Sequence, residues 1–169
     1  QFNYNVMQLL AHGIDRTEID TTEHQQLVHN LFRVVLQQLK DIGLMKKDDI
    51  LKYGLARHAC CYEDGSNYTE SRLRFFIDWD PTSLACPGKY SGSLPLHNID
   101  NNQMFQSLFK AGIMYFPKKR GMCFLFRNNG FGRTPFKLAC EKFGRDEVVK
   151  VVENTIADYY SGNNNNNNI

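Results

Sequence analysis

Four consecutive residues, His58-Ala59-Cys60-Cys61, carry the thiol and imidazole groups that metal sites and nucleophilic catalysis use. A structural zinc site needs four such ligands, usually in two closely spaced pairs. The next cysteine is Cys86, and no two cysteines have the Cys-x-x-Cys spacing. We therefore interpret Cys60 as a small buried residue between helices, as free cysteine commonly is, and we expect no metal and no cofactor.

A cysteine hydrolase would place a thiolate beside a histidine that a third group orients. Cys61 or Cys123 could pair with His97 or His58, but no local signature accompanies any of these pairs. The sequence therefore predicts no catalytic residues and no enzyme. An enzyme or metal protein built on these groups stays open as an alternative, which predicts bound zinc or inactivation by thiol alkylation.

Two further segments have the composition of binding loops. Residues 128–133 are rich in asparagine and glycine, but they lack both the Gly-x-Gly-x-x-Gly pattern after a strand and the Gly-Lys-Ser/Thr ending of phosphate loops. Residues 117–120, Pro-Lys-Lys-Arg, resemble the short basic runs that nuclear import receptors read. A solvated loop is the ordinary alternative for such a run.

The composition is that of a globular protein, with 169 residues, 42% hydrophobic and 22% charged. A formal net charge of +2 argues against a dedicated nucleic-acid binder. No apolar run approaches the roughly 18 residues that span a bilayer, and five cysteines with one adjacent pair make a poor disulfide framework. The first residues do not form a signal peptide. We expect an intracellular protein, cytoplasmic or nuclear, although an upstream targeting segment would not be visible in a chain without an initiator methionine.

An internal repeat of forty residues organises the chain. Residues 92–97, Gly-Ser-Leu-Pro-Leu-His, match residues 132–137, Gly-Arg-Thr-Pro-Phe-Lys, and Ala59-Cys60 matches Ala139-Cys140 in the same register. In each unit, glycine permits a tight turn. In the last unit, Thr134 suits a helix N-cap, Pro135 suits the first helical position, Gly144 interrupts the helix, and a second helix begins near Arg145.

Hydrophobic periodicity predicts the remaining helices. In the middle unit we expect a short helix from Pro95 to about Asn101 and a second helix that ends near Gly112. A helix before Asp80-Pro81 and another opening near residues 48–49 are also expected, as is a long N-terminal helix opened by a capping box of Thr22 and Gln25. The predicted apolar faces are Leu27, Leu31, Val34, Val35 and Ile42; Leu73, Phe76 and Ile77; Met104, Phe105, Leu108 and Phe109; and Val148, Val149, Val152 and Ile156.

The segments 132–140, Gly-x-Thr-Pro-Phe-x-Leu-Ala-Cys, and 94–97, Leu-Pro-Leu-His, resemble the Gly-x-Thr-Pro-Leu-His-x-Ala-Ala core of ankyrin repeats. With residues 78–84 and 105–113, the chain is similar to divergent ankyrin-like proteins common in diatoms. It departs from the pattern where Lys137 replaces histidine, where Lys52 replaces the turn glycine, and where the units exceed the usual length of about 33 residues.

The resemblance implies an all-α stack of ankyrin-type helix–loop–helix repeats, a solenoid. Its parts are a degenerate N-terminal repeat or helical cap (1–51), about three ankyrin-like repeats (52–91, 92–131 and 132–160) and a flexible Asn-rich tail (161–169). The implied function is a protein–protein interaction module, an adaptor or scaffold, whose protein partner the sequence does not identify. No small-molecule substrate, nucleic acid or membrane is expected as a partner. A structural subunit of a larger assembly is the alternative, and it predicts exposed apolar patches and self-association.

Partners of ankyrin repeats contact the turn tips and the exposed positions of the first helices. Carried over to this sequence, those positions are the partner-binding candidates Lys89, Tyr90, Ser93, Asn101, Phe131, Arg133, Glu141 and Lys142. Phe131 precedes a turn glycine, where an exposed aromatic ring suits an interface anchor. His97 occupies the position at which the ankyrin histidine bonds to backbone, so the resemblance implies a structural role for it.

Overall fold

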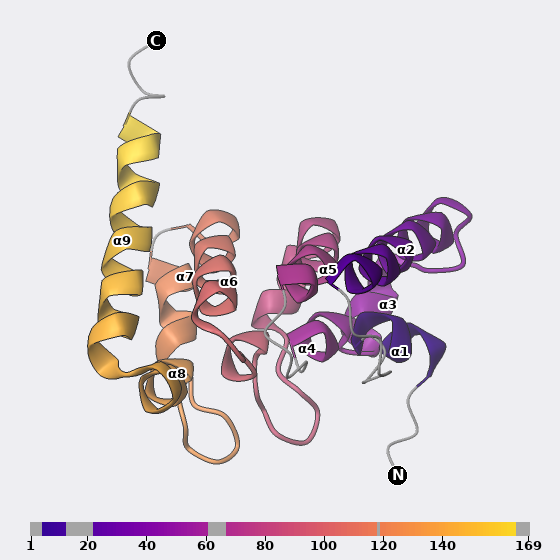
Figure 1. Cartoon of the computed structure of the whole chain (residues 1–169). Coiled ribbons are helices and arrows are strands. Elements are labelled where there is room, and N and C mark those ends of the chain that lie inside the picture. The colour runs from indigo at the N-terminus through magenta and orange to yellow at the C-terminus, as the bar shows by residue number, and fades with distance from the viewer. Residues whose placement is uncertain (1–4, 13–21, 61–66, 118, 165–169) are drawn as a thin grey trace. The chain divides into compact units, whose positions relative to one another are not determined.

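The computed structural model describes residues 5–12, 22–60, 67–117 and 119–164 (Figure 1). Within these ranges the regular structure is entirely helical and contains no strand, which confirms the all-α prediction. No helix among them is long and apolar enough to cross a membrane. Contacts divide the chain into two compact units, residues 1–86 and 87–169. The side chains of Thr22 and Gln25, all of Cys61 and the last residues of the Asn-rich tail lie outside the described parts.

The described residues of the first unit form five α-helices and one 3-10 turn. They are α1 (Val6–His12), α2 (Thr22–Asp41), α3 (Lys47–Lys52), α4 (Leu55–Cys60), α5 (Asn67–Trp79) and η1 (Pro81–Ala85). Helix α4 packs against α1, α3 and α5, and α2 packs against α5. Helix α5 ends at Trp79, which confirms the expected stop at Asp80-Pro81. The buried Asp80 carboxylate accepts hydrogen bonds from the Thr82 amide at 3.2 Å and the Thr82 hydroxyl at 2.7 Å, and it caps η1.

The face of α2 that packs inward is not the predicted one. Its predicted apolar residues are 37–66% exposed, and the prediction of a buried stripe there was wrong: Leu27, Leu31, Val34, Val35 and, just beyond the helix, Ile42. Leu36 is instead fully buried, and the Lys40 ammonium lies 4.7 Å from the ring centroid of Trp79 on α5. The helix carries apolar residues on more than one face, and packing against α5 selects the face with Leu36.

In the second unit, the part of the chain that the structure describes forms four α-helices and two 3-10 turns. They are η2 (Pro95–His97), α6 (Asn102–Tyr115), α7 (Lys119–Cys123), η3 (Phe124–Phe126), α8 (Pro135–Phe143) and α9 (Arg145–Asn164). Helix α6 packs against α7, α8 and α9, and α8 packs against α9. The predicted apolar face of α6 is confirmed as core: Met104, Phe105, Leu108 and Phe109.

Three details of this unit differ from the prediction. The expected helix from Pro95 to Asn101 is a single 3-10 turn, because the backbone leaves the helical region at Asn98 (φ −111°, ψ 39°) and Asn101 instead caps α6. Helix α6 continues one turn past Gly112 to Tyr115. On α9 the buried positions are Val148, Val151 and Thr155, whereas the predicted Val149, Val152 and Ile156 are only half-buried.

Local signals at the start and end of α8 are confirmed. The Thr134 hydroxyl accepts a hydrogen bond from the Lys137 amide at 3.2 Å, and Pro135 occupies the first turn. Gly144 ends the helix with a φ of 88°, and α9 begins at the next residue. The repeat-related Gly92 and Gly132 share positive φ values of 63° and 70°. In repeat 52–91 the ankyrin pattern expects the turn glycine at Lys52, but Lys52 lies within α3. The residue with positive φ there is Gly54 (φ 62°).

A short additional helix lies between α6 and the following turn. Helix α7 contacts α6 through backbone, because a Cβ atom at Gly121 would lie 2.4 Å from the Gly112 carbonyl oxygen. The ring of Phe124 then packs edge-on against Phe116. Helix α7 and η3 therefore account for part of the forty-residue spacing between Gly92 and Gly132.

Candidate functional site

Two turns of the second unit, residues 88–93 and 129–133, are bonded to each other, and we call them the paired turns. A backbone hydrogen bond of 2.9 Å closes the base of each turn. The Gly130 amide donates to the Ser91 carbonyl at 2.7 Å, which joins the two turns. The close approach favours glycine here, because a Cβ atom at Gly130 would lie 3.0 Å from the same carbonyl oxygen and one at Gly92 would lie 3.1 Å from the Gly130 nitrogen, both shorter than most Cβ contacts.

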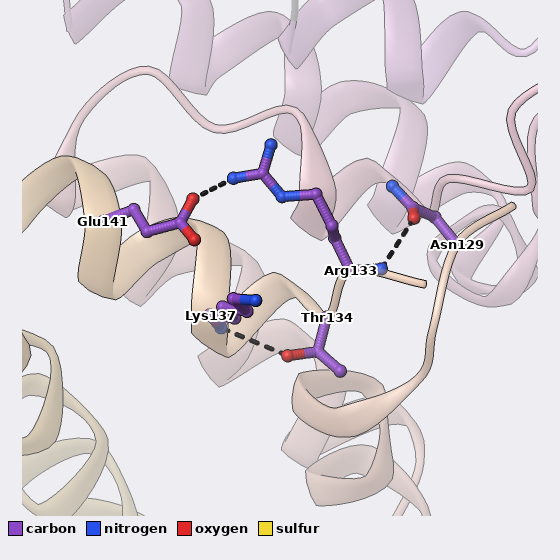
Figure 2. A network of polar contacts seen from close by, with 5 residues as sticks. All are labelled: Asn129, Arg133, Thr134, Lys137 and Glu141. Atoms are coloured by element: carbon purple, nitrogen blue, oxygen red, sulfur yellow. Dashed lines mark hydrogen bonds and ion pairs between the residues drawn. The ribbon is translucent and has the colours of Figure 1, made fainter. Parts of the chain in front are cut away.

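The side chain of Asn129 holds the second turn and links it to the first. Its Oδ1 accepts hydrogen bonds from the amides of Phe131 and Arg133, each at 3.0 Å, and its Nδ2 donates to the Ser93 hydroxyl at 3.3 Å. Figure 2 shows the bond to Arg133. Asn129 was not among the predicted site residues. The available signal was an asparagine before a glycine-containing turn, since asparagine often bonds to backbone two residues further on.

His97 connects the paired turns to the helical part of the unit. Its Nδ1 accepts a hydrogen bond from the Leu94 amide at 2.9 Å, and its Nε2 donates to the carbonyls of Arg127 and Arg133 at 3.1 and 3.2 Å. This pattern requires one neutral tautomer, and burial lowers the pKa of His97 below its usual value of 6.5. Both ring nitrogens are occupied, which confirms the expected bonding of this imidazole to backbone.

The tips of the paired turns carry two exposed aromatic rings. Tyr90 is 92% exposed and Phe131 is 75% exposed. The ammonium of the exposed Lys89 lies 5.5 Å from the ring centroid of Tyr90. The hydrogen bonds fix the backbone from which these rings project, and tyrosine is among the residues that most often carry binding energy at interfaces.

Ion pairs connect the second turn and α8 to their neighbours. Arg133 and Glu141 on α8 form an exposed pair (Figure 2). The ammonium of Lys142 bonds to the Asp100 carboxylate at 2.7 Å and to the Ile99 carbonyl at 3.1 Å. Two of the predicted partner-binding residues, Arg133 and Glu141, are thus paired with each other, whereas Lys142 pairs with Asp100.

Ser93 and Asn101 lie differently from the other candidates. Ser93 is 6% exposed, and its hydroxyl accepts the bond from Asn129. The Asn101 side chain accepts a hydrogen bond from the Met104 amide at 2.7 Å and thereby caps α6. Both side chains support the elements beneath the surface.

The cysteine and histidine residues do not form a cluster in the described part of the chain. Those residues contain no group of three or more His, Cys, Asp or Glu side chains able to hold a metal ion. Cys60 is fully buried, and its thiol donates to the Ala56 carbonyl within α4 at 3.2 Å. Burial raises the pKa of Cys140 on α8, which favours the thiol over the nucleophilic thiolate.

No model of a protein family matches the chain, and no curated protein or solved structure matches it either. The interpretation of the paired turns therefore depends on their own geometry and chemistry.

Proposed function

We propose that the chain is an ankyrin-type protein-binding module, an adaptor or scaffold without catalytic activity. Its partner contacts the paired turns and the exposed side of α8. One observation carries the proposal: Tyr90 and Phe131 stand exposed on two turns whose backbones are hydrogen-bonded to each other and to His97. A rigid frame that presents aromatic rings to solvent is typical of an interaction surface.

The ankyrin-type part of this proposal is supported by how the repeat-related residues are used. Gly92 and Gly132 have the same left-handed backbone, and Pro95 and Pro135 each begin a helical segment. The imidazole of His97, in repeat 92–131, bonds to the carbonyl of Arg133, which lies in the turn that opens repeat 132–160. These contacts are what a stack of forty-residue units needs to join one repeat to the next.

The proposal is tested by affinity capture with the full chain and with the double variant Phe131→Ala, Arg133→Ala. Captured proteins are quantified by mass spectrometry. Tyr160→Ala is the matched control, because Tyr160 is an exposed aromatic residue (55%) on α9 and not on the turns. A protein that the intact chain and the control capture, and that the folded double variant loses, supports the proposal. Equal capture by all three places the interface elsewhere and contradicts it.

A second candidate function, a structural subunit of a larger assembly, is favoured by the exposed apolar residues of α2. Leu27, Leu31 and Val34 are each more than half exposed. If these residues are an assembly contact, the isolated chain should self-associate in sedimentation velocity experiments, and Leu31→Gln should reduce the association. A monomer at all accessible concentrations would count against this function and would leave the adaptor proposal unaffected.

A further inference from the structure

Positive charge is concentrated in the part of the chain that contains the paired turns. Residues 87–140 include eight lysines and arginines and a single carboxylate, Asp100, while the whole chain has a net charge of only +2. The rest of the sequence is correspondingly acidic. Such an asymmetry within one chain produces a local field that selects partners of the opposite charge.

Part of this charge lies at the exposed aromatic residues. Lys89 is adjacent to Tyr90 on the first turn, Arg133 is two residues beyond Phe131, and Lys137 is on the first turn of α8. The close view in Figure 2 shows Lys137 on α8 and Arg133 before it. Lys89 and Lys137 are exposed, and neither forms an ion pair with another residue that the structure describes. The one carboxylate of the segment, Asp100, is already bonded to Lys142.

We propose that the paired turns bind an acidic segment of a partner protein that contains apolar residues between its carboxylates. Lys89, Arg133 and Lys137 interact with the carboxylates, and Tyr90 and Phe131 pack on the apolar side chains. The inference rests on the proposed function and adds the chemical class of the partner. Complementary charge raises the rate of encounter and excludes basic partners, while the aromatic contacts provide most of the affinity.

The arrangement of carboxylates favours an acidic peptide over a nucleic acid. Glu141 is paired with Arg133, and Asp100 is paired with Lys142, so negative charges lie among the cations around α8. Each strand of a DNA duplex carries a phosphate about every 3.4 Å of helix axis, and many closely spaced cations neutralise it best. A peptide carboxylate can instead replace Glu141 on the guanidinium of Arg133, because arginine forms bidentate hydrogen bonds with carboxylates.

The test is a selection of displayed random 16-residue peptides on the full chain, followed by measurement of Kd for the enriched peptides. Lys89→Gln with Lys137→Gln removes two charges and leaves the Arg133–Glu141 pair in place. Lys46→Gln with Lys150→Gln is the matched control, since both lysines are exposed and lie outside the basic segment, before α3 and on α9. Thermal unfolding verifies that each variant is folded.

We expect the enriched peptides to be rich in Asp and Glu around a Leu or aromatic residue. The double variant should weaken their binding roughly three- to ten-fold, as expected for two exposed charges, and the control should not change it. Glu141→Gln should tighten binding about two-fold, because Arg133 is then available without competition.

Two results would overturn the inference but not the proposed function. The first is a set of enriched peptides without acidic excess whose binding Phe131→Ala still abolishes. The second is that the double variant and its control change the Kd of the enriched peptides equally, while Phe131→Ala still abolishes binding. If no enriched peptide depends on the paired turns, both fail. Tighter binding of a 15-nucleotide oligo(dT) than of any peptide, lost in the same double variant, would overturn the inference in favour of a nucleic acid.

Discussion

Replacing His97 by alanine should lower the free energy of unfolding by about 2–4 kcal/mol. The substitution leaves the buried Leu94 amide without its acceptor at 2.9 Å, and it leaves the carbonyls of Arg127 and Arg133 without the shared Nε2 donor. An unsatisfied buried polar group costs about 1–3 kcal/mol, and the lost imidazole packing adds to that. His97→Asn should cost less, because its amide oxygen can still accept from the Leu94 amide.

Urea unfolding followed by far-ultraviolet circular dichroism at pH 7.5 measures both variants. With a denaturant slope of about 2 kcal/mol per molar urea, the midpoint for His97→Ala should fall by roughly 1–2 M. A His97→Ala variant whose unfolding free energy lies within about 0.5 kcal/mol of that of the intact chain, a difference typical of surface substitutions, would contradict this role of His97.

The same residue gives the unfolding free energy a pH dependence of known sign. Burial lowers the pKa of His97 in the folded chain below the value of 6.5 that applies when unfolded. As the pH falls below 6.5, the unfolded chain therefore binds the proton first, and the folded state loses stability until the pH passes the folded pKa. His97→Asn should remove this part of the pH dependence. An identical slope below pH 6.5 in both proteins would contradict the neutral tautomer assigned here.

Further predictions concern the turns and the contact between α6 and α7. Asn129→Ala should reduce the unfolding free energy by about 1–2 kcal/mol, because two turn amides lose their acceptor; Asn129→Asp keeps that acceptor and should cost less in the same urea assay. Gly121→Ala should cost about 3 kcal/mol or more, since its Cβ would overlap the Gly112 carbonyl, whereas Lys119→Ala on the same helix should be nearly neutral. Gly130→Ala should separate the paired turns and accelerate hydrogen exchange of its own amide; unchanged exchange would show that the turns are not joined there.

The features that the sequence predicted correctly are those that a few adjacent residues decide. The Thr134 cap, Pro135 in the first turn and Gly144 at the end of α8 depend only on local backbone chemistry. The turn glycines Gly92 and Gly132 were found for the same reason, since few other residues adopt a positive φ at low cost.

The features that the sequence did not predict depend on distant neighbours. Helix α2 has apolar residues on several faces, and only its packing against α5 decides that Leu36 is buried while Leu31 is exposed. The segment after Pro95 has a helical apolar pattern, yet Asn101 is used as the cap of α6, which leaves room for only one 3-10 turn.

The sequence predicted exposed positions of the candidate site but not the hydrogen bonds that hold the turns beneath them. Tyr90 and Phe131 are exposed as expected of turn tips. Ser93 and Asn101 were assigned to the same surface because the resemblance to ankyrin repeats aligns sequence positions. It does not show which side chains are buried or bonded to backbone. A local signal pointed to the bonds of Asn129 within its own turn, but its bond to Ser93, thirty-six residues away, has no local pattern that reveals it.

The hydrogen bond between Gly130 and Ser91 bears on the entropy of binding. Surface loops are usually mobile, and fixing the backbone of one residue on association costs roughly 1–2 kcal/mol. Here the backbones beneath Tyr90 and Phe131 are joined before any encounter, so much of that cost has been met during folding. A partner of the paired turns would then meet a preorganised surface, and substitutions that loosen the joint would weaken binding without removing a single contact.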